Sequence, residues 1–485
     1  MDKLKKNKYK NTIKPISDCP VTDYKVDKNS LVITQALLKK SEELFNNNRQ
    51  FIFSQNVMAR NNPNQNLFVY SSNPSSSSTV PHIFSTKLSS DFDITNQHSS
   101  GRCWIFSALN ILRHEMSKKY DLPQDFELSQ PYIFFYNKLE LMNYKLQMVV
   151  KYKDLSFDDY RSRLSVRKSG LTDGGHWDMF CNIIKKYGIV PKSVFGESWN
   201  TNNTKYLNKI LVLKFKEWAE ILRNKKKSQC NKCINDMLIE THRLLLIHIG
   251  TPPKIFDWNF YNKKNTKLKS YRNITPSKFY KKFVPVNVDD YIGFVNDPRH
   301  KFNKKISTEY SSNMIGAPLK EFINVPIETL KLLAFKTLKK DMAVWFTSDS
   351  DKYFDSYYGI WDKDQYNYKI AYGTEPKQSK KSQLEYKVSG PGHAMIFSGC
   401  HVPKQNKKTK LQYPTLWRVD NSWGKTIGKD GRLIITDSYF SEYVYEIVIP
   451  KKIAYNFDKK FKNINISKKN IIMLPPWDVF GSVST

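Results

Sequence analysis

The 485-residue chain is poor in cysteine and has no long hydrophobic run. Its cysteines are few and irregularly spaced, which excludes a disulfide-stabilised scaffold; they are Cys19, Cys103, Cys181, Cys230, Cys233 and Cys400. No stretch reaches the roughly 18 consecutive apolar residues of a membrane-spanning helix. The first residues, MDKLKKNKYKNTIKP, lack the apolar core of a signal peptide. We therefore expect a cytoplasmic protein that is kept in a reducing environment and has no membrane partner.

Glycine, proline and acidic residues are also scarce. Only 18 Gly and 22 Pro occur, which excludes a collagen-like chain, while 40% hydrophobic and 14% aromatic residues exclude disorder throughout. The 78 Lys and Arg residues outnumber 45 Asp and Glu residues, for a net charge of +33. Such an excess favours contact with a polyanion, either nucleic acid or an acidic membrane surface. Biased codon usage is the alternative explanation.

The order of the expected secondary structure divides the chain into segments. Residues 1–30 are a Lys- and Asn-rich tail that we expect to be flexible. Residues 31–203 show helical periodicity, whereas residues 326–470 contain short strand-like runs separated by turns. Between them, residues 204–325 are predicted to be a basic, mainly helical insertion, and residues 204–310 alone hold 23 basic and 9 acidic residues. Helices first and antiparallel strands last predict an α+β protein.

Four residues in a fixed order predict cysteine-hydrolase chemistry. Such enzymes need a thiolate nucleophile, an imidazole to activate it, a group to orient the imidazole and a donor for the oxyanion. Cys103 begins a helical pattern, where the helix dipole favours the thiolate. Gln97, six residues earlier, is the predicted oxyanion donor. His393 opens one predicted strand and Asn421 ends another, so neighbouring strands would carry the base and its orienting amide.

The segments around these residues resemble the bleomycin hydrolase family of papain-like cysteine peptidases. NQHSSGRCWIFSALN, which contains Cys103, is similar to the papain-like nucleophile segment. His393 lies 290 residues after Cys103, whereas about 130–150 separate these residues in papain-like enzymes. The excess includes the basic insertion, as in the bleomycin hydrolase branch. The likeness also includes DGGHWDM, VNDPR, GHAM, WRVDNSWG and LPPWDVFG.

The resemblance implies a fold, an assembly and an activity. The fold is a papain-like core, with a helical half and an antiparallel β-barrel half, carrying a helical hook insertion. The assembly is a homohexamer whose sites face an interior channel. The activity is that of an intracellular thiol aminopeptidase acting on peptides with a free N-terminus and on bleomycin-like amides. The resemblance implies neither a cofactor nor a metal.

The same resemblance assigns substrate-binding positions. Gly174 and Gly175 correspond to a glycine pair along which a peptide backbone lies, although a simple helix-initiating turn is the alternative. Residues 471–485 correspond to a tail that reaches the active site. In that arrangement the carboxylate of Thr485 would pair with the free ammonium of the substrate.

Two other functions remain open from the sequence. A nucleic-acid-binding scaffold protein would use the basic insertion, including the cluster 225–227. A papain-like endopeptidase would use the same catalytic residues on internal bonds. Cys230 and Cys233 have the spacing of half a zinc site, but no second such pair occurs, so we interpret them as unpaired cysteines.

Overall fold

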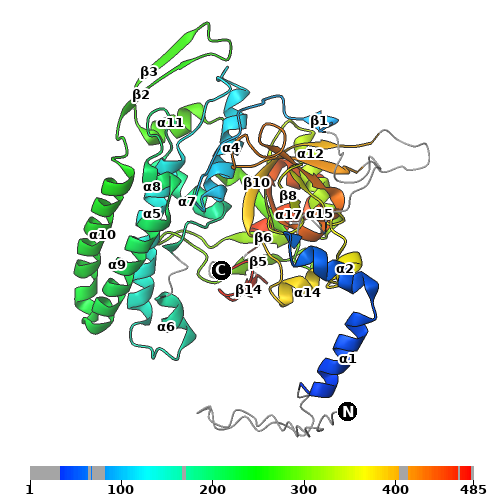
Figure 1. Ribbon diagram of the computed structural model, residues 1–485. Coiled ribbons are helices and arrows are strands. Elements are labelled where there is room, and N and C mark those ends of the chain that lie inside the picture. The colour runs from blue at the N-terminus through cyan, green and yellow to red at the C-terminus, as the bar shows by residue number, and fades with distance from the viewer. Residues whose placement is uncertain are drawn as a thin grey trace, which may run out of the picture. The chain divides into compact units, whose positions relative to one another are not determined.

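The computed structural model describes residues 33–63, 67, 82–166, 171–403, 413–467 and 470–481. The predicted tail, residues 1–30, lies outside them. The chain forms two compact units. One contains the helices α1 (Gln35–Asn46), α2 (Arg49–Met58) and α13 (Tyr368–Tyr372). The other contains every further described element (Figure 1).

The larger unit begins with a group of helices. They are α4 (Cys103–Ser117), α5 (Gln130–Tyr152), α6 (Tyr160–Ser165), α7 (Trp177–Tyr187) and α8 (Trp199–Asn202). Helix α4 is buried on all sides from Trp104 to Met116. Such a helix belongs to the core of a large domain. Ser129 caps α5 by accepting a hydrogen bond from the backbone of Tyr132.

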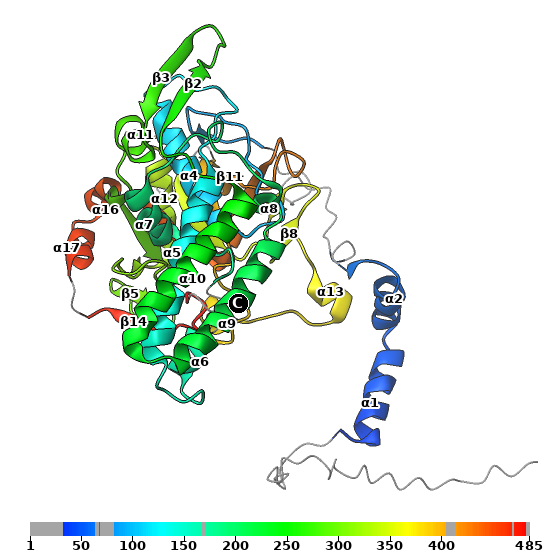
Figure 2. The same cartoon turned by 90° about the vertical axis from the view of Figure 1, so that its left-hand side faces the viewer.

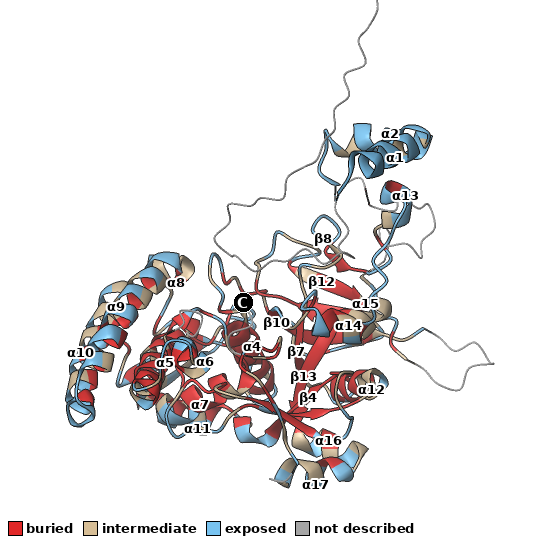
Figure 3. Ribbon diagram, turned by 90° about the horizontal axis from the view of Figure 1, so that it is seen from below, coloured by how far each residue is buried: buried red, intermediate tan, exposed pale blue. Residues whose placement is uncertain are grey.

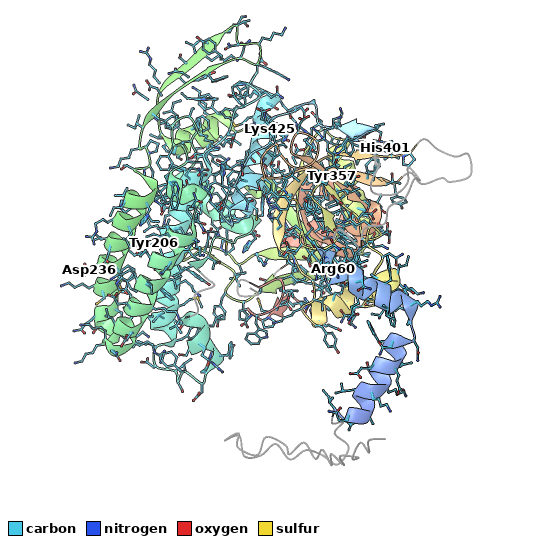
Figure 4. All side chains as sticks on the ribbon, in the orientation of Figure 1. Arg60, Tyr206, Asp236, Tyr357, His401 and Lys425 are labelled. Atoms are coloured by element: carbon cyan, nitrogen blue, oxygen red, sulfur yellow. The ribbon has the colours of Figure 1, made fainter. Side chains whose placement is uncertain are left out.

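A helical hairpin and a β-hairpin follow. Their elements are α9 (Lys205–Asn224), α10 (Lys227–Ile249), β2 (Phe256–Tyr261), β3 (Leu268–Ile274), α11 (Pro276–Phe283) and the short 3₁₀ helix η3 (Val288–Asp290). Helices α9 and α10 run side by side next to α5 (Figures 1 and 2). Their inner residues are buried, and the opposite face is exposed (Figure 3). Asp236 projects from the outer side of α10 (Figure 4).

A large mixed sheet forms the second half of this unit. Its strands are β1 (Thr86–Lys87), β4 (Tyr291–Val295), β5 (Lys305–Thr308), β6 (Glu321–Asn324), β7 (Val344–Ser348), β8 (Phe354–Asp355), β9 (Ile360–Trp361), β10 (His393–His401), β11 (Leu416–Asp420), β12 (Arg432–Thr436), β13 (Val444–Pro450) and β14 (Ile472–Leu474). The strand order is β14-β5-β6-β4-β13-β7-β10-β11-β12-β9-β8, with β1 beside β10. Most pairs are antiparallel, so the predicted α+β class is confirmed.

Three strands of the large sheet were not predicted from the sequence. Strands β4, β5 and β6, within residues 291–324, belong to the large sheet, although their sequence was grouped with the mainly helical segment 204–325. The last helix of that segment, η3, ends at Asp290, and the segment also contains the hairpin of β2 and β3. Their burial explains the difference: β4 and β5 are buried along their whole length and lack the alternating pattern that marks a half-exposed strand.

Helices on both sides cover the centre of the sheet. Helix α4 packs against β10 and β7, and α12 (Ile327–Leu338) packs against β10, β13 and β7. The remaining helices are α14 (Lys380–Glu385), α15 (Asp437–Tyr443), α16 (Lys451–Phe457) and α17 (Lys460–Ile466). The buried strands lie between these helices (Figure 3). No helix in the described part of the chain combines the length and hydropathy needed to cross a membrane.

An aromatic stack at the centre of the sheet should contribute strongly to stability. Phe346 on β7 and Phe397 on β10 are fully buried, with ring centroids 3.7 Å apart. We expect Phe397→Ala to lower the free energy of unfolding by about 3–5 kcal/mol, because it leaves a cavity in the core. Tyr357, labelled in Figure 4, is 84% exposed and is the control; Tyr357→Ala should change stability by less than about 0.5 kcal/mol. Urea titration measures both; equal losses would contradict this role of the stack.

Candidate active site

The fold brings the four predicted catalytic residues to one cleft. Cys103 is the first residue of α4, His393 is the first residue of β10, and Asn421 directly follows β11. Gln97 precedes α4, and its backbone N–H donates to the carbonyl of Ser422 at 2.8 Å. Gln97, Cys103 and His393 line a cleft of about 520 Å³ between α4 and the sheet. Gln97 and Ser422, which are 325 positions apart in the chain, thus meet because β10 pairs with β11 and packs on α4.

The imidazole of His393 is held in one orientation. Its Nε2 lies 2.8 Å from Oδ1 of Asn421, and that oxygen also accepts the backbone N–H of Ser422 at 2.7 Å. Since an amide oxygen only accepts, Nε2 carries the proton and Nδ1 is directed to Cys103. The ring of Trp423 stacks on His393 at 5.1 Å, and Asn421 is buried. The His–Asn contact is therefore shielded from water.

The charges of Cys103 and His393 support each other. Burial raises the pKa of the Cys103 thiol, but the charge of His393 and hydrogen bonds from His393 and nearby backbone outweigh it, so the pKa lies below its ordinary value. Burial lowers the pKa of His393, but the charge of Cys103 and hydrogen bonds with Cys103 and Asn421 raise it above its ordinary value. The two shifts favour a thiolate–imidazolium pair, the reactive form of such a nucleophile.

The side chain of Gln97 faces the same cleft as a donor. One N–H of its amide donates to the carbonyl of Ser100 at 2.5 Å, and since a carbonyl only accepts, this contact fixes which end of the amide is the NH₂ group. Its Oε1 then accepts the hydroxyl of Ser422 at 2.6 Å. The second N–H is then available to an oxyanion formed near Cys103. Ser422 was not identified from the sequence, where it stands beside Asn421 only as part of the WRVDNSWG segment.

A buried carboxylate, Asp173, fixes the loop before Cys103. Its side chain pairs with the ammonium of Lys138 at 3.0 Å and accepts the backbone N–H of Gly101 at 3.1 Å. Thr204 and Asn208 also donate to it. Burial alone would raise the pKa of Asp173, but the charge of Lys138 and these hydrogen bonds hold it at about 2. This role was not predicted from the sequence, where the only signal is an acidic residue beside the glycine pair.

The two predicted substrate-binding glycines differ in their surroundings. A Cβ atom on Gly175 would lie 2.5 Å from the buried indole ring of Trp104. A Cβ on Gly174 would meet nothing within 4 Å, and both glycines line the cleft. Trp104 also donates its indole N–H to the carbonyl of Asp173 at 2.7 Å. Gly175 is therefore required by packing, whereas Gly174 leaves space beside the cleft.

The chain approaches the same cleft again near its C-terminus. Val479, Phe480 and Gly481 line it. This segment is held by Arg299, which bonds through both terminal nitrogens to Asp478, at 2.9 and 3.0 Å. The predicted terminal residue Thr485 lies outside the described residues, so its contact with a substrate stays a prediction.

Comparisons with known proteins found a family model and several relatives. A family model, the Peptidase C1-like family, matches residues 32–481. Bleomycin hydrolase of Homo sapiens is 35% identical over 461 residues, covering 93% of this chain and 97% of that protein. Bleomycin hydrolase of Mus musculus is 37% identical over 402 residues, covering 81% and 86%. "Cysteine proteinase 1, mitochondrial" of Saccharomyces cerevisiae (strain JAY291) is 36% identical over 421 residues, covering 83% of each chain.

A solved structure supports the fold. The crystal structure of PepW from Lactobacillus rhamnosis superimposes with a TM-score of 0.85 at 32% identity, covering 92% of this chain and 98% of that one. The fold and these relatives define a papain-like cysteine peptidase. The chain belongs to the Peptidase C1-like family, and the predicted resemblance to bleomycin hydrolases is confirmed.

The thiolate–imidazolium pair predicts selective alkylation. Because the pKa of Cys103 is lowered, iodoacetamide should modify it at pH 6 before the other five cysteines. Burial raises the pKa of Cys181 and raises that of Cys400 to about 12, so both should stay unmodified. Peptide mapping by mass spectrometry over time gives the order. Earlier modification of Cys230 or Cys233 would contradict the ion pair.

The same ion pair predicts the pH dependence of hydrolysis. Hydrolysis should fall at low pH as Cys103 is protonated and at high pH as His393 loses its proton.

The glycine pair provides a matched test. Gly175→Ala should cost about 1–3 kcal/mol of stability, because its methyl group would overlap the ring of Trp104. Gly174→Ala should leave stability unchanged and raise KM by narrowing the cleft. Urea titration and steady-state kinetics separate the two effects. If Gly174→Ala leaves KM unchanged, Gly174 serves only as a turn residue.

Proposed function

We propose that this protein is a thiol aminopeptidase of the bleomycin hydrolase type, which removes N-terminal residues from peptides and bleomycin-like amides. Cys103 is the nucleophile, His393 the acid and base, Asn421 the residue that orients His393, and Gln97 the oxyanion donor. The observation that carries the proposal is the contact of Cys103, His393 and Asn421 at the cleft that the C-terminal segment also lines. Gly174 and Gly175 lie alongside the peptide backbone.

The proposed reaction has two steps at the scissile carbonyl. Sγ of Cys103 attacks the carbonyl carbon, and the oxyanion that forms accepts hydrogen bonds from Gln97 and from the backbone N–H of Cys103. His393 then gives its Nδ1 proton to the leaving nitrogen, the C–N bond breaks, and a thioester remains. In the second step His393 takes a proton from water, the resulting hydroxide displaces the thiolate, and the acid product leaves.

The C-terminal segment supports exopeptidase action. Arg299 holds Asp478, and the following residues Val479 to Gly481 line the cleft. We propose that residues 482–485 continue along the cleft and that the carboxylate of Thr485 pairs with the free ammonium of the substrate. Such a charge pair would position the first peptide bond, and no later one, at Cys103.

Removal of the tail should change the bond that is cleaved. We expect deletion of residues 482–485 to allow hydrolysis of N-blocked peptides, while Cys103 is alkylated at its normal rate. The measurement compares N-acetylated and free peptides by mass spectrometry, with Cys103→Ala as the inactive control. A full-length enzyme that already cleaves N-blocked peptides would instead support the papain-like endopeptidase alternative. A truncated enzyme that still requires a free N-terminus would show that the tail does not set specificity.

We further propose a homohexamer with the sites on an interior channel. Size-exclusion chromatography with light scattering would measure its mass, and a stable monomer that retains full aminopeptidase activity would contradict it. A cytoplasmic location also stays a prediction, and the yeast relative carries the word "mitochondrial" in its name.

A second candidate function is binding of nucleic acid. Lys225, Lys226 and Lys227 are exposed at the turn between α9 and α10, and none forms an ion pair within the described chain. If they bind phosphate groups, affinity for DNA or RNA should fall steeply with salt. Replacing the three with Ser should reduce that salt dependence and leave amide hydrolysis intact. No binding at about 50 mM salt would favour biased codon usage as the origin of the charge.

A further inference from the structure

The loop that leads into His393 contains two glycines. It runs from Ser389 to Gly392, between α14 and β10, with the sequence Ser-Gly-Pro-Gly. Glycine leaves a chain free to adopt many conformations, so such a loop does not by itself fix the residue that follows it. A misplacement of about 1 Å can cost an enzyme about 100-fold in rate. The contacts of this loop therefore bear on the position of the histidine.

Two residues at the end of β7 hold the two ends of this loop. The backbone N–H of Gly392 donates to the carbonyl of Ser348 at 3.0 Å. The hydroxyl of Ser389 donates to Oδ2 of the next residue, Asp349, at 2.6 Å. Ser348 is also the strand partner of His393. The end of β7 thus sets the position of the histidine both through the strand pairing and through the loop before it.

A buried phenol extends this contact into a chain of hydrogen bonds. The hydroxyl of Tyr445, a fully buried residue of β13, donates to Oγ of Ser389 at 2.6 Å. Burial raises the pKa of Tyr445, so the phenol stays neutral and keeps its proton. Each hydroxyl has one proton, and a carboxylate only accepts. The order of donation is therefore fixed, from Tyr445 to Ser389 and from Ser389 to Asp349.

Helix α15 holds the acceptor at the end of this chain. The backbone N–H of Asp349 donates to the carbonyl of Tyr443 at 3.2 Å, and the carbonyl of Asp349 accepts the hydroxyl of Tyr439 at 2.5 Å. Burial raises the pKa of Asp349, and the hydrogen bond from Ser389 opposes that shift. The carboxyl group is therefore a fixed point to which Ser389 is tied.

The C-terminal segment packs on the same group of residues. The rings of Phe480 and Tyr445 lie edge to face with their centroids 6.2 Å apart. A Cβ on Gly390 would lie 3.2 Å from Cβ of Val479, so the loop also touches this segment. Nζ of Lys380 lies 4.7 Å from the centre of the Tyr445 ring. Tyr445→Phe keeps the ring in these contacts and removes only the hydroxyl.

We propose that the hydrogen-bond chain Tyr445–Ser389–Asp349 positions His393 by fixing the loop before it, which keeps the imidazole aligned with the catalytic thiol. The described residues that line the cleft include none of the three, so they act through the loop and not on the substrate. They are positioning residues, and they complement Asn421, which orients the imidazole from its Nε2 side. This inference rests on the proposed peptidase function and adds residues to it.

The first test measures hydrolysis of alanine coumarylamide and alkylation of Cys103. Ser389→Ala should lower kcat about 10-fold or more with little change in KM, because His393 takes part in the chemical step. The rate of alkylation by iodoacetamide at pH 6, relative to the rate at about pH 9, should also fall, since the thiolate loses its charge partner. Tyr132→Phe is the matched control and should change neither quantity. Tyr132 is 2% exposed, and its hydroxyl donates to the carbonyl of Tyr187 at 2.9 Å.

The order of the chain gives a second test. Because Tyr445 acts only through Ser389, Tyr445→Phe alone should lower kcat. Added to Ser389→Ala, it should lower kcat no further. Two independent losses would instead multiply, as expected for sites that do not interact. Multiplied losses in the double variant would therefore overturn the proposed chain.

The outcomes separate the positioning role from the peptidase function. If Ser389→Ala loses stability in urea but keeps its kcat and its alkylation ratio, the hydrogen bonds serve folding alone and the proposal is overturned. If the unmodified protein hydrolyses no amide, the proposed function fails. A lower alkylation ratio in Ser389→Ala then still supports the positioning role, and an unchanged ratio overturns it. If Ser389→Ala does not fold, Tyr445→Phe takes its place in the same measurements.

Discussion

The buried carboxylate of Asp173 is the interaction on which the arrangement of the site depends. It receives the ammonium of Lys138 from α5, the backbone N–H of Gly101 from the loop before the nucleophile, and donors from Thr204 and Asn208 at the start of the α9–α10 hairpin. Three separate segments therefore meet at one charge. Removing one partner of a buried pair leaves an uncompensated charge, which typically costs about 3–5 kcal/mol. Asp173 consequently links the position of the loop before Cys103 to the attachment of the α9–α10 hairpin.

The two halves of the larger unit contribute different parts of the chemistry. Helix α4 provides Cys103 at its N-terminal end, where the helix dipole favours a thiolate. The sheet provides His393 and, beside it, the Asn421 amide that fixes the ring. Because α4 packs directly on β10, the thiol and imidazole are held by rigid elements. The pKa shifts of Cys103 and His393 require both halves, because the charge of each residue is the main charge that acts on the other.

The sequence predicted which residues would meet at the cleft where a particular residue stands in a recognisable local pattern, while the catalytic roles of these residues stay predictions. Gln97, Cys103, His393 and Asn421 each stand in such a segment, and the α+β class followed from the order of helical and strand patterns. The strands β4 to β6 were missed because strands buried on both faces lack alternation. Asp173 and Ser422 were missed because their roles depend on partners from distant segments, and no spacing rule encodes such contacts.

The polar residues of the cleft contrast with the apolar core of the sheet. The core of the sheet is apolar and closely packed, as the Phe346–Phe397 stack illustrates. At the cleft, by contrast, Glu446 is buried beside Thr347 with one carboxyl oxygen that has no partner in the described chain. Burial raises the pKa of Glu446, and the charge of Lys320, which lines the same cleft, opposes that shift. An apolar residue at position 446 would therefore leave the buried ammonium of Lys320 without this opposite charge, which is a cost that the apolar core of the sheet does not carry.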